Sequence, residues 1–406
     1  MAQYIVIPAD IEPAVVCSLK GSKKPEWLLL APEATRKVVV DDQEVKENYN
    51  PRVEFLNALT EADTLYAPLG GVGDALLIGA YQRGASVHRM TFLDINHFKE
   101  ILEISDQLSP PAKLTKEGGR QVERCQSASA MAMLVHQGEC SHFRPFEEVD
   151  VRISLIRVYI NQLIATQDEI RKRLQQRTTR LERDQEYFLD SSASAIAAEH
   201  RVQLVEGKGP VDSLLEYEKE LEREIKKQLG KLPVYTEVLE PVKGMGPRLA
   251  ARIIAPIVDI RRFSKLAGFQ KYTGWHVMQN GRPRAAQFIR GESAQFHQLL
   301  RQGIWLFGQQ LVRSNSEFAW YYRKYKEERQ EQLGTVVATT DKGKELTLTK
   351  VWLDARARRH AASKFLKYFW YAWWELHTGK QSTSPSGKRF WARDLREPER
   401  LYGEDW

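Results

Sequence analysis

The spacing of apolar residues changes near residue 146, and no other feature restricts the possible folds of this chain as strongly. Up to about residue 140, short apolar runs of strand length alternate with helical stretches. Beyond Phe146, apolar residues recur at helical intervals, at Val149, Ile153, Ile156, Ile160 and Leu163. The sequence therefore predicts an α/β domain followed by long amphipathic helices, a fold of class α/β plus α.

The N-terminal segment has the pattern of three consecutive strands followed by a βαβ unit. Strands are expected in four short apolar runs, at 4–7, 14–19, 27–30 and 64–67. A helix at 73–83 and a parallel strand at 86–90 would complete the βαβ unit. This order is similar to that of an RNase H or RuvC-like fold.

Two charged helical segments follow, separated by a break at 190–198. The run 171–183 is dense in charge, which is typical of a solvated helix face, with contact to RNA or DNA as the alternative. The segment 213–229 has an apolar side formed by Leu214, Leu215, Tyr217 and Leu221. We expect a helical coiled-coil arm, either an antiparallel hairpin or a surface through which the protein forms a homo-oligomer.

A glycine-rich turn at 244–247 precedes a basic helical run from Arg248 to Ile254. Such a turn directs unpaired backbone N–H groups at whatever lies at the helix N-terminus, where the helix dipole favours phosphate. Lys243 and Arg252 would add positive charge. The pattern suits a helix-hairpin-helix-like clamp on a nucleic-acid backbone, although similar turns also join helices in proteins that bind no nucleic acid.

Basic and aromatic residues continue beyond this turn, a combination that suits phosphate contact and base stacking. The candidates for backbone contact are Lys243, Gly244, Gly246, Arg248, Arg252, Arg261, Arg262, Arg282, Arg284 and Arg290. Tyr272 and Trp275 are the candidates for stacking on bases. A last helix at about 350–377 combines basic residues with an aromatic run, 365–374, that we expect to lie in the core.

Composition sets the broader class of protein. At 406 residues, 42% of them hydrophobic, the chain is long enough for two or three domains, and its net charge of +7 favours an anionic partner. Cys17, Cys125 and Cys140 lack the spacing of disulfides or of a zinc site, which fits a reducing cytoplasm. No signal sequence opens the chain and no apolar run approaches the roughly 20 residues of a membrane span, so we expect a cytoplasmic protein without a membrane partner.

The order of motifs in the C-terminal half resembles that of the DEDD insertion-sequence transposases, which are bridge-RNA-guided recombinases. The motifs are Gly244-Met245-Gly246-Pro247, Asp259 to Phe263, Tyr272-Thr273-Gly274, Asn280-Gly281 and Ile289-Arg290-Gly291. The resemblance implies a RuvC-like domain at 1–145, a coiled-coil arm at 146–232 and a transposase domain at 233–330. A basic aromatic helix and a polar tail would occupy 331–406.

The resemblance also implies four carboxylates that hold two divalent metals, and a nucleophilic serine. The first acid belongs where Pro8 stands, with Asp10 two residues on. The other three positions are occupied by Ala67, Gln126 and Ser129, none of which carries a carboxylate. Asn280 stands where the family has its serine, and an amide does not attack a phosphodiester. The nearest serine is Ser293.

These replacements favour a repurposed, catalytically inactive relative that binds DNA, a structured RNA or an RNA-guided target, without a cofactor. One alternative is an active Mg²⁺-dependent transposase or recombinase that uses substitute acids, with Asp10, Asp63, Asp74 and Asp94 as candidates. These acids are also typical of helix caps and turns. A second alternative is a non-catalytic subunit whose partner is a nuclease.

Overall fold

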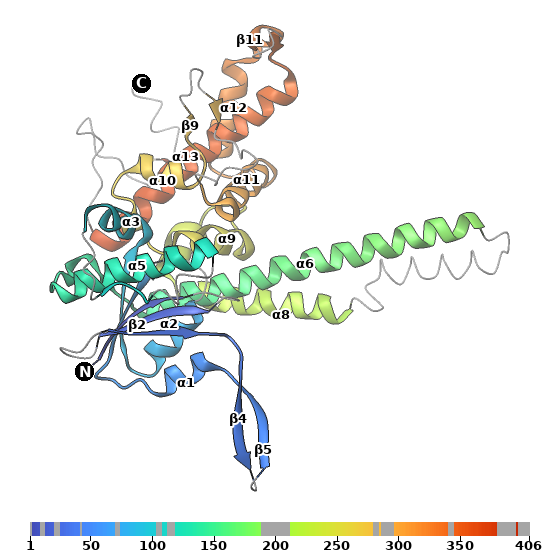
Figure 1. Ribbon diagram of the computed structural model, residues 1–406. Coiled ribbons are helices and arrows are strands. Elements are labelled where there is room, and N and C mark those ends of the chain that lie inside the picture. The colour runs from blue at the N-terminus through green and yellow to red at the C-terminus, as the bar shows by residue number, and fades with distance from the viewer. Residues whose placement is uncertain are drawn as a thin grey trace. The chain divides into compact units, whose positions relative to one another are not determined.

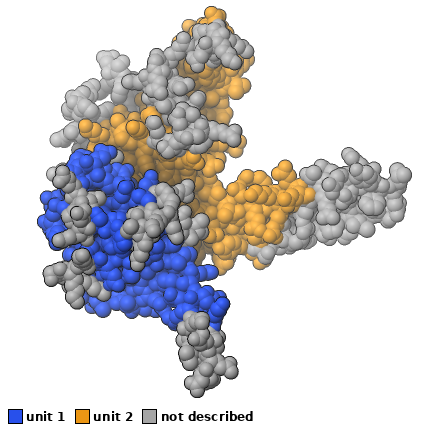
Figure 2. All heavy atoms as spheres, viewed as in Figure 1, with its two compact units in different colours: residues 1–154 blue, residues 155–406 orange. Residues whose placement is uncertain are grey.

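A computed structural model of the chain divides into two compact units, residues 1–154 and 155–406 (Figure 2). The residues that the structure describes are 2–8, 13–19, 25–40, 43–69, 74–102, 108–111, 118–187, 212–278, 284–285, 296–339, 345–379 and 395–396. Within these ranges, none of the helices is long and apolar enough to cross a membrane.

Unit 1 contains a six-stranded mixed sheet in the order β3-β2-β1-β6-β7-β8 (Figure 1). The strands are β1 (Gln3–Ile7), β2 (Ala14–Leu19), β3 (Glu26–Leu30), β6 (Thr64–Leu69), β7 (Ser86–Thr91) and β8 (Arg144–Pro145). β1, β2 and β3 pair antiparallel, β1, β6 and β7 pair parallel, and β8 is antiparallel to β7. The strands expected at 4–7, 14–19, 27–30, 64–67 and 86–90 are confirmed. A hairpin of β4 (Ala34–Val40) and β5 (Gln43–Tyr49) was not expected.

Helices α1 (Pro51–Asn57), α2 (Asp74–Gln82), α3 (Phe92–Ile101) and α5 (Gly118–His136) complete unit 1, with a 3₁₀ turn at Cys140–His142. α5 packs on one face of the sheet. Its buried residues Cys125, Ala128 and Met131 share a hydrophobic cluster with Ile5 of β1 and Tyr66 of β6. Small side chains such as Ala128 allow the helix backbone to approach the strands closely.

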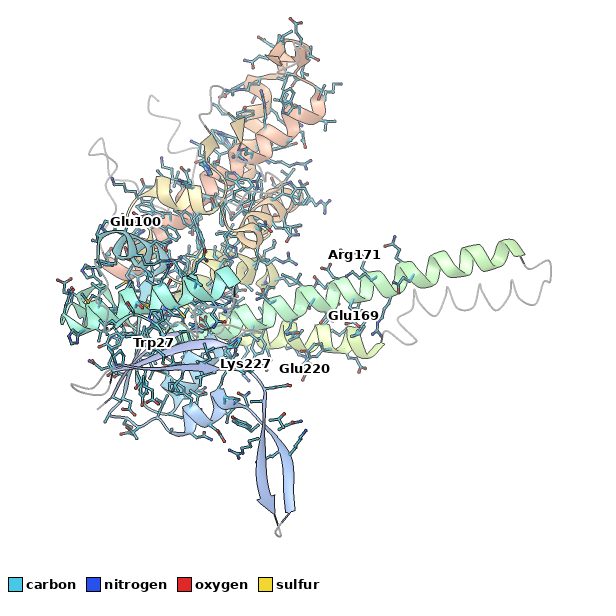
Figure 3. The ribbon with its side chains drawn as sticks, in the orientation of Figure 1. Trp27, Glu100, Glu169, Arg171, Glu220 and Lys227 are labelled. Carbon is cyan, nitrogen blue, oxygen red and sulfur yellow. The ribbon has the colours of Figure 1, made fainter. Side chains whose placement is uncertain are left out.

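α6 (Glu148–Tyr187) begins in unit 1 and continues through unit 2, where α8 (Asp212–Leu229) runs beside it in the opposite direction (Figure 1). Gln167 of α6 donates a hydrogen bond to Glu218 of α8 at 2.7 Å. Arg171 pairs with Asp168 at 3.0 Å within α6, so its charge is satisfied along the helix surface (Figure 3). The two predicted helices are therefore present. The expected break at 190–198 lies outside the described residues.

The remainder of unit 2 is mainly helical. Its elements are the π-helical turn Val234–Leu239, α9 (Pro247–Ile257), the 3₁₀ turns Ile260–Arg262 and Gln330–Gln332, α10 (Leu266–Tyr272), α11 (Gln298–Arg313), α12 (Ala319–Glu328) and α13 (Lys350–Thr378). Two short antiparallel pairs join β9 (Val277–Met278) to β10 (Arg284–Ala285) and β11 (Val336–Thr339) to β12 (Glu345–Thr347).

The aromatic run of α13 forms the core of unit 2, as expected. Phe365 packs against Phe307 of α11 with ring centroids 4.3 Å apart, and against Phe318 at 5.6 Å. The indole N–H groups of Trp370 and Trp374 both donate to the carbonyl oxygen of Phe263, at 3.1 and 3.2 Å. These aromatic residues therefore serve packing. Of the polar tail after Gly379, the structure describes only 395–396.

Candidate nucleic-acid interface

The glycine turn before α9 has the geometry of an anion-binding helix start. Gly244 has φ +87°, and a Cβ there would collide with the hydroxyl of Ser314, so only glycine fits. The Met245 N–H donates to the Val242 carbonyl at 3.0 Å, which closes the turn. Exposed Gly246 is the N-cap, and among the described residues no side chain of the N-cap bonds to the helix. Pro247 has no N–H, so the N–H groups of Arg248 and Leu249 are the ones without an acceptor in the helix itself.

An open groove of about 1140 Å³ surrounds this turn. Basic side chains of α8 line one side and the turn lines the other, and the residues that set its charge are Lys219, Arg223, Lys226, Lys243, Arg248, Glu222 and Glu240. Five of these seven side chains are cationic. The groove thus combines positive charge with a helix N-terminus, which suits a phosphate group.

Arg248 is already engaged with α8. Its guanidinium lies 3.1 Å from a carboxylate oxygen of Glu218 and also pairs with Glu222, while 47% of its side chain remains exposed. A phosphate would have to compete with these two carboxylates for Arg248. The local sequence around 244–254 gives no sign of this competition.

Arg252 lies where α9 crosses α11. Burial, and secondarily the charge of Arg248, lowers the pKa of Arg252 below its ordinary value. Its guanidinium donates to the side-chain oxygen of Gln302 at 3.3 Å. Gly303 makes this crossing close, because a Cβ there would stand 3.2 Å from the Cβ of Arg252. The half-buried Arg252 therefore helps to pack α9 against α11 as well as adding charge.

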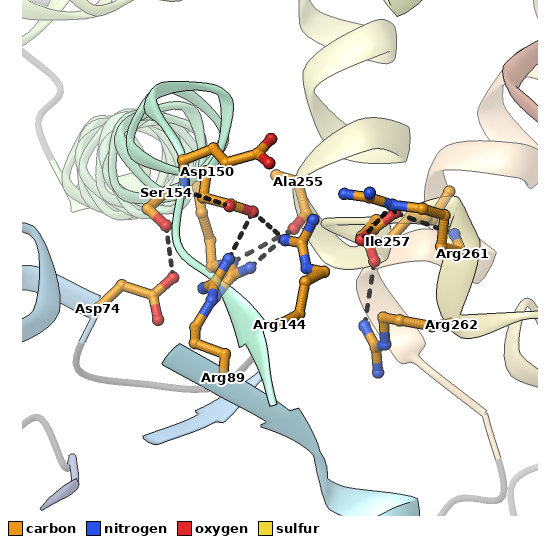
Figure 4. A network of polar contacts seen from close by, with 12 residues as sticks. Asp74, Arg89, Arg144, Asp150, Ser154, Ala255, Ile257, Arg261 and Arg262 are labelled. Carbon is orange, nitrogen blue, oxygen red and sulfur yellow. Dashed lines mark hydrogen bonds and ion pairs between the residues drawn. The ribbon is translucent and has the colours of Figure 1, made fainter. Parts of the chain in front are cut away.

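Arg261 and Arg262 stabilise the turn after α9 (Figure 4). Arg261 pairs with the buried carboxylate of Asp259 at 3.1 Å, and Arg262 donates to the Ile257 carbonyl at 3.0 Å. Arg262 also lies over the ring of Tyr272, whose hydroxyl donates to the Pro256 carbonyl at 2.8 Å. Arg262 and Tyr272, both predicted to contact nucleic acid, thus make internal contacts here.

Trp275 belongs to a second groove, of about 1110 Å³, between α11 and α13. Trp275 is only 8% exposed, its indole N–H donates to the Arg359 carbonyl at 3.1 Å, and the Arg359 guanidinium lies 5.0 Å above its ring. Arg301 and Trp305 of α11 line the same groove. The sequence analysis did not single out these two residues, although their i, i+4 spacing on a predicted helix places them on one face.

The remaining predicted contact residues cannot be placed in either groove. Arg282, Arg290, Asn280 and Ser293 lie outside the described residues, as does the candidate acid Asp10. Arg284 begins β10, and only its backbone is described.

The residues that stand at three of the family's carboxylate positions, Ala67, Gln126 and Ser129, lie on β6 and α5. Ala67 pairs in register with Arg89, so it lies on the sheet face opposite to its neighbour Tyr66, which packs with α5. Ser129 of α5 is buried, and its hydroxyl donates to the Leu108 carbonyl at 2.9 Å. Gln126, one turn earlier on α5, is exposed.

Three of the four substitute acids have structural partners. Asp63 accepts hydrogen bonds from the Ala2 N–H, the Thr60 N–H and the Thr60 hydroxyl, each at 2.9 Å. Burial acts to raise the pKa of Asp63, but these hydrogen bonds outweigh it and hold the pKa below its ordinary value. Asp94 exchanges hydrogen bonds with Thr91, the N-cap of α3. Asp74 accepts from the Ser154 hydroxyl at 2.7 Å.

A buried ion-pair network was not predicted. Arg89 and Arg144 converge on Asp150 in the first turn of α6, with Arg89 2.6 Å from the carboxylate (Figure 4). The Glu147 N–H donates to the second oxygen of Asp150 at 2.9 Å. Among the described residues, no group of three or more His, Cys, Asp and Glu side chains is arranged to hold a metal ion.

Comparison with known families adds a direct assignment. The sequence model of the Transposase IS116/IS110/IS902 family matches residues 236–323. This region contains the glycine turn at 244–247, α9, α10 and α11, and ends within α12. No curated protein matches the chain. This match over residues 236–323 supports an IS110-type transposase family member.

Proposed function

We propose that this protein is a transposase-related nucleic-acid-binding protein that has lost strand cleavage. One observation carries the loss of catalysis. A carboxylate is missing at both Ala67 and Ser129, and the Ser129 hydroxyl is committed to the Leu108 carbonyl. Without converging carboxylates, two divalent metals would not be held against a phosphodiester.

We further propose that unit 1 has an RNase H/RuvC-like fold. Its antiparallel β1-β2-β3 and the parallel β6 and β7 beside β1 support this assignment. In such a sheet the carboxyl ends of β1 and β6 lie next to each other, and metal ligands would be needed there. The described strands end in the buried apolar residues Ile7 and Leu69, which supports a scaffold that has kept its shape without its chemistry.

Nucleic-acid binding is proposed for the groove around the glycine turn. The exposed start of α9 and the cations of α8 would contact phosphates, with DNA as the first candidate partner and a structured or guide RNA as the second. The paired helices α6 and α8 support a coiled-coil arm, through which we propose that the protein forms a homo-oligomer.

The test uses the full chain with a labelled DNA duplex and a labelled structured RNA, at a series of salt concentrations and with Mg²⁺ present. Fluorescence anisotropy reports binding, and denaturing gels report cleaved or joined strands. We expect binding that weakens steeply with salt, without a new product. Cleavage that disappears in Asp10→Ala would contradict the loss of catalysis. Failure to bind either nucleic acid would contradict the binding function.

A further inference from the structure

The groove between α11 and α13 combines an exposed indole with two arginines, Arg301 and Arg359, that have no carboxylate partner among the described residues. It has a volume of about 1110 Å³, which is slightly above the roughly 300 to 1,000 Å³ typical of small-molecule sites. The residues that give it its chemistry are Trp275, Phe296, Arg301, Trp305, Arg358 and Arg359. Of these residues, only Trp275 was assigned a role in nucleic-acid binding from the sequence.

Trp305 offers a stacking surface. Its side chain is 56% exposed, although a tryptophan on a packed helix normally buries most of its large apolar area. The other aromatic residues of the groove are covered, because Arg359 lies over Trp275 and Arg301 lies over Phe296 at 4.4 Å. Trp305 is therefore the aromatic side chain of this groove with a face open to a ligand.

Arg301 and Arg359 bring two positive charges into the same groove. Burial lowers the pKa of both, and Arg301 also lowers the pKa of Arg359, so the two charges repel each other. The charge of both also contributes to the lowered pKa of His276, after burial and Lys271. Within the described ranges of the chain, neither arginine forms an ion pair with a carboxylate. An anion between them would offset this repulsion.

Arg358 differs from Arg301 and Arg359 in having an acidic partner. It pairs with Asp354 and donates to the side-chain oxygen of Gln309, so its charge is balanced within the groove. The cationic character of the groove therefore rests on Arg301 and Arg359. Both guanidiniums are held in place, since Arg301 stacks on Phe296 and Arg359 donates to the His276 carbonyl at 3.2 Å.

We propose that this groove binds an unpaired nucleotide, with its base stacked on Trp305 and its phosphate beside Arg301 and Arg359. Only a base that has left its duplex offers a free face to an indole, whereas phosphate contact alone does not distinguish single from double strands. The inference rests on the proposed nucleic-acid binding and adds a second site that is selective for single strands. For the glycine turn before α9, only backbone contact is proposed.

The experiment compares variants of the full chain by fluorescence anisotropy with a labelled DNA single strand, an RNA single strand and a DNA duplex of the same sequence. Trp305→Ala removes the stacking surface and Trp305→Phe keeps one. Arg301→Gln removes one charge from the groove. Arg313→Gln is its matched control, because Arg313 is an exposed arginine of the same helix that does not line the groove.

We expect Trp305→Ala to weaken binding to a single strand about tenfold and to leave duplex binding nearly unchanged, with Trp305→Phe close to the unmodified protein. Arg301→Gln should lower the slope of log affinity against log salt concentration by about one for the single strand. Arg313→Gln should change this slope less. Comparison of the DNA and RNA strands identifies which polymer supplies the nucleotide.

The other outcomes separate the two proposals. If Trp305→Ala binds all three ligands as the unmodified protein does, or loses duplex and single strand equally, this groove is not a nucleotide site, while the binding function stands. If the unmodified protein binds none of the three ligands, the proposed function itself fails.

Discussion

The guanidinium of Arg248, at the start of α9, lies 3.1 Å from a carboxylate oxygen of Glu218 on α8. Glu222 pairs with the same arginine from one turn further along α8. Glu222 lines the groove in which we propose that a phosphate binds, whereas Glu218 contacts Arg248 without lining that groove. The charge of Arg248 is therefore already partly neutralised by the protein.

Removing this competition should strengthen nucleic-acid binding. We expect Glu218→Gln to lower the dissociation constant for DNA about two- to fivefold, because a partly exposed ion pair contributes up to about 1 kcal/mol. The measurement is a titration by anisotropy at low salt. Glu220→Gln is the matched control, since Glu220 is exposed on α8 and does not line the groove (Figure 3). Equal strengthening by both variants would indicate a general charge effect and not release of Arg248.

The conformation of the glycine turn should be costly to alter. Gly244→Ala places a side chain at φ +87° against Ser314, and we expect a loss of about 2 kcal/mol in the free energy of unfolding. Urea denaturation measures the loss. Gly268→Ala in α10 is the control, because no atom lies within 4 Å of its added Cβ and helix propensity favours alanine. A Gly244→Ala protein as stable as this control would show that the turn adapts.

The buried carboxylate of Asp150 should be essential to unit 1. Asp150→Asn leaves two arginines without their counter-ion, and we expect a loss of about 3 to 5 kcal/mol, typical of a broken buried ion pair. Denaturation should show a much smaller effect for Asp168→Asn, since its pair with Arg171 is exposed and contributes at most about 1 kcal/mol. Similar losses in both variants would contradict a special role of burial.

Acid should destabilise unit 2 through His297. Burial, and then the charges of Arg157 and Arg262, lowers the pKa of His297 to about 4. Because the unfolded chain binds the proton near pH 6.5 and the folded protein does not, stability is full above about pH 6.5 and falls as the pH drops towards about 4. Urea denaturation at several pH values would detect this slope.

The contribution of His297 to this pH dependence can be tested by replacing it with an N-cap residue that does not titrate. The neutral Nδ1 of His297 accepts from the Leu300 N–H at 3.4 Å as the N-cap of α11, and asparagine can fill the same role without titrating. His297→Asn should therefore have a flatter pH dependence between pH 6.5 and 4. His360, whose pKa burial also lowers to about 4, and His276, whose pKa is lowered first by burial, would contribute to the slope that remains. An unchanged slope in the variant would exclude His297 as a source.

Local periodicity was sufficient to predict β1, β2, β3, β6 and β7 of unit 1 and the long helices of unit 2, because both patterns depend on neighbours in the sequence. The partners of individual polar residues depend on distant segments. Tyr272 was predicted to stack on a base, yet its hydroxyl contacts Pro256 and its ring packs beside Phe263. Arg248 was predicted to grip phosphate, but its carboxylate partners lie some thirty residues earlier, on α8.

The register of the strands could not be predicted from local sequence either. The sequence motif located Ala67, but the sheet face on which it lies follows from its pairing with Arg89, because paired residues share a face. A register shift of one residue would move Ala67 to the other face. The hairpin of β4 and β5, which forms a separate two-stranded sheet, was missed. Arg301 and Trp305 could have been found from their helical spacing, whereas Trp275 and Arg359 meet them only through the packing of α11 against α13.

α13 joins the groove to the core within one continuous helix. Arg358 and Arg359 lie fewer than two turns before Phe365, whose ring is fully buried between α11 and Phe318. Because α13 is anchored in the core, the groove residues that it carries are pre-organised. Binding of a ligand would therefore cost little affinity for ordering these side chains. By mass action, occupation of the groove should also raise the melting temperature of unit 2 as a whole.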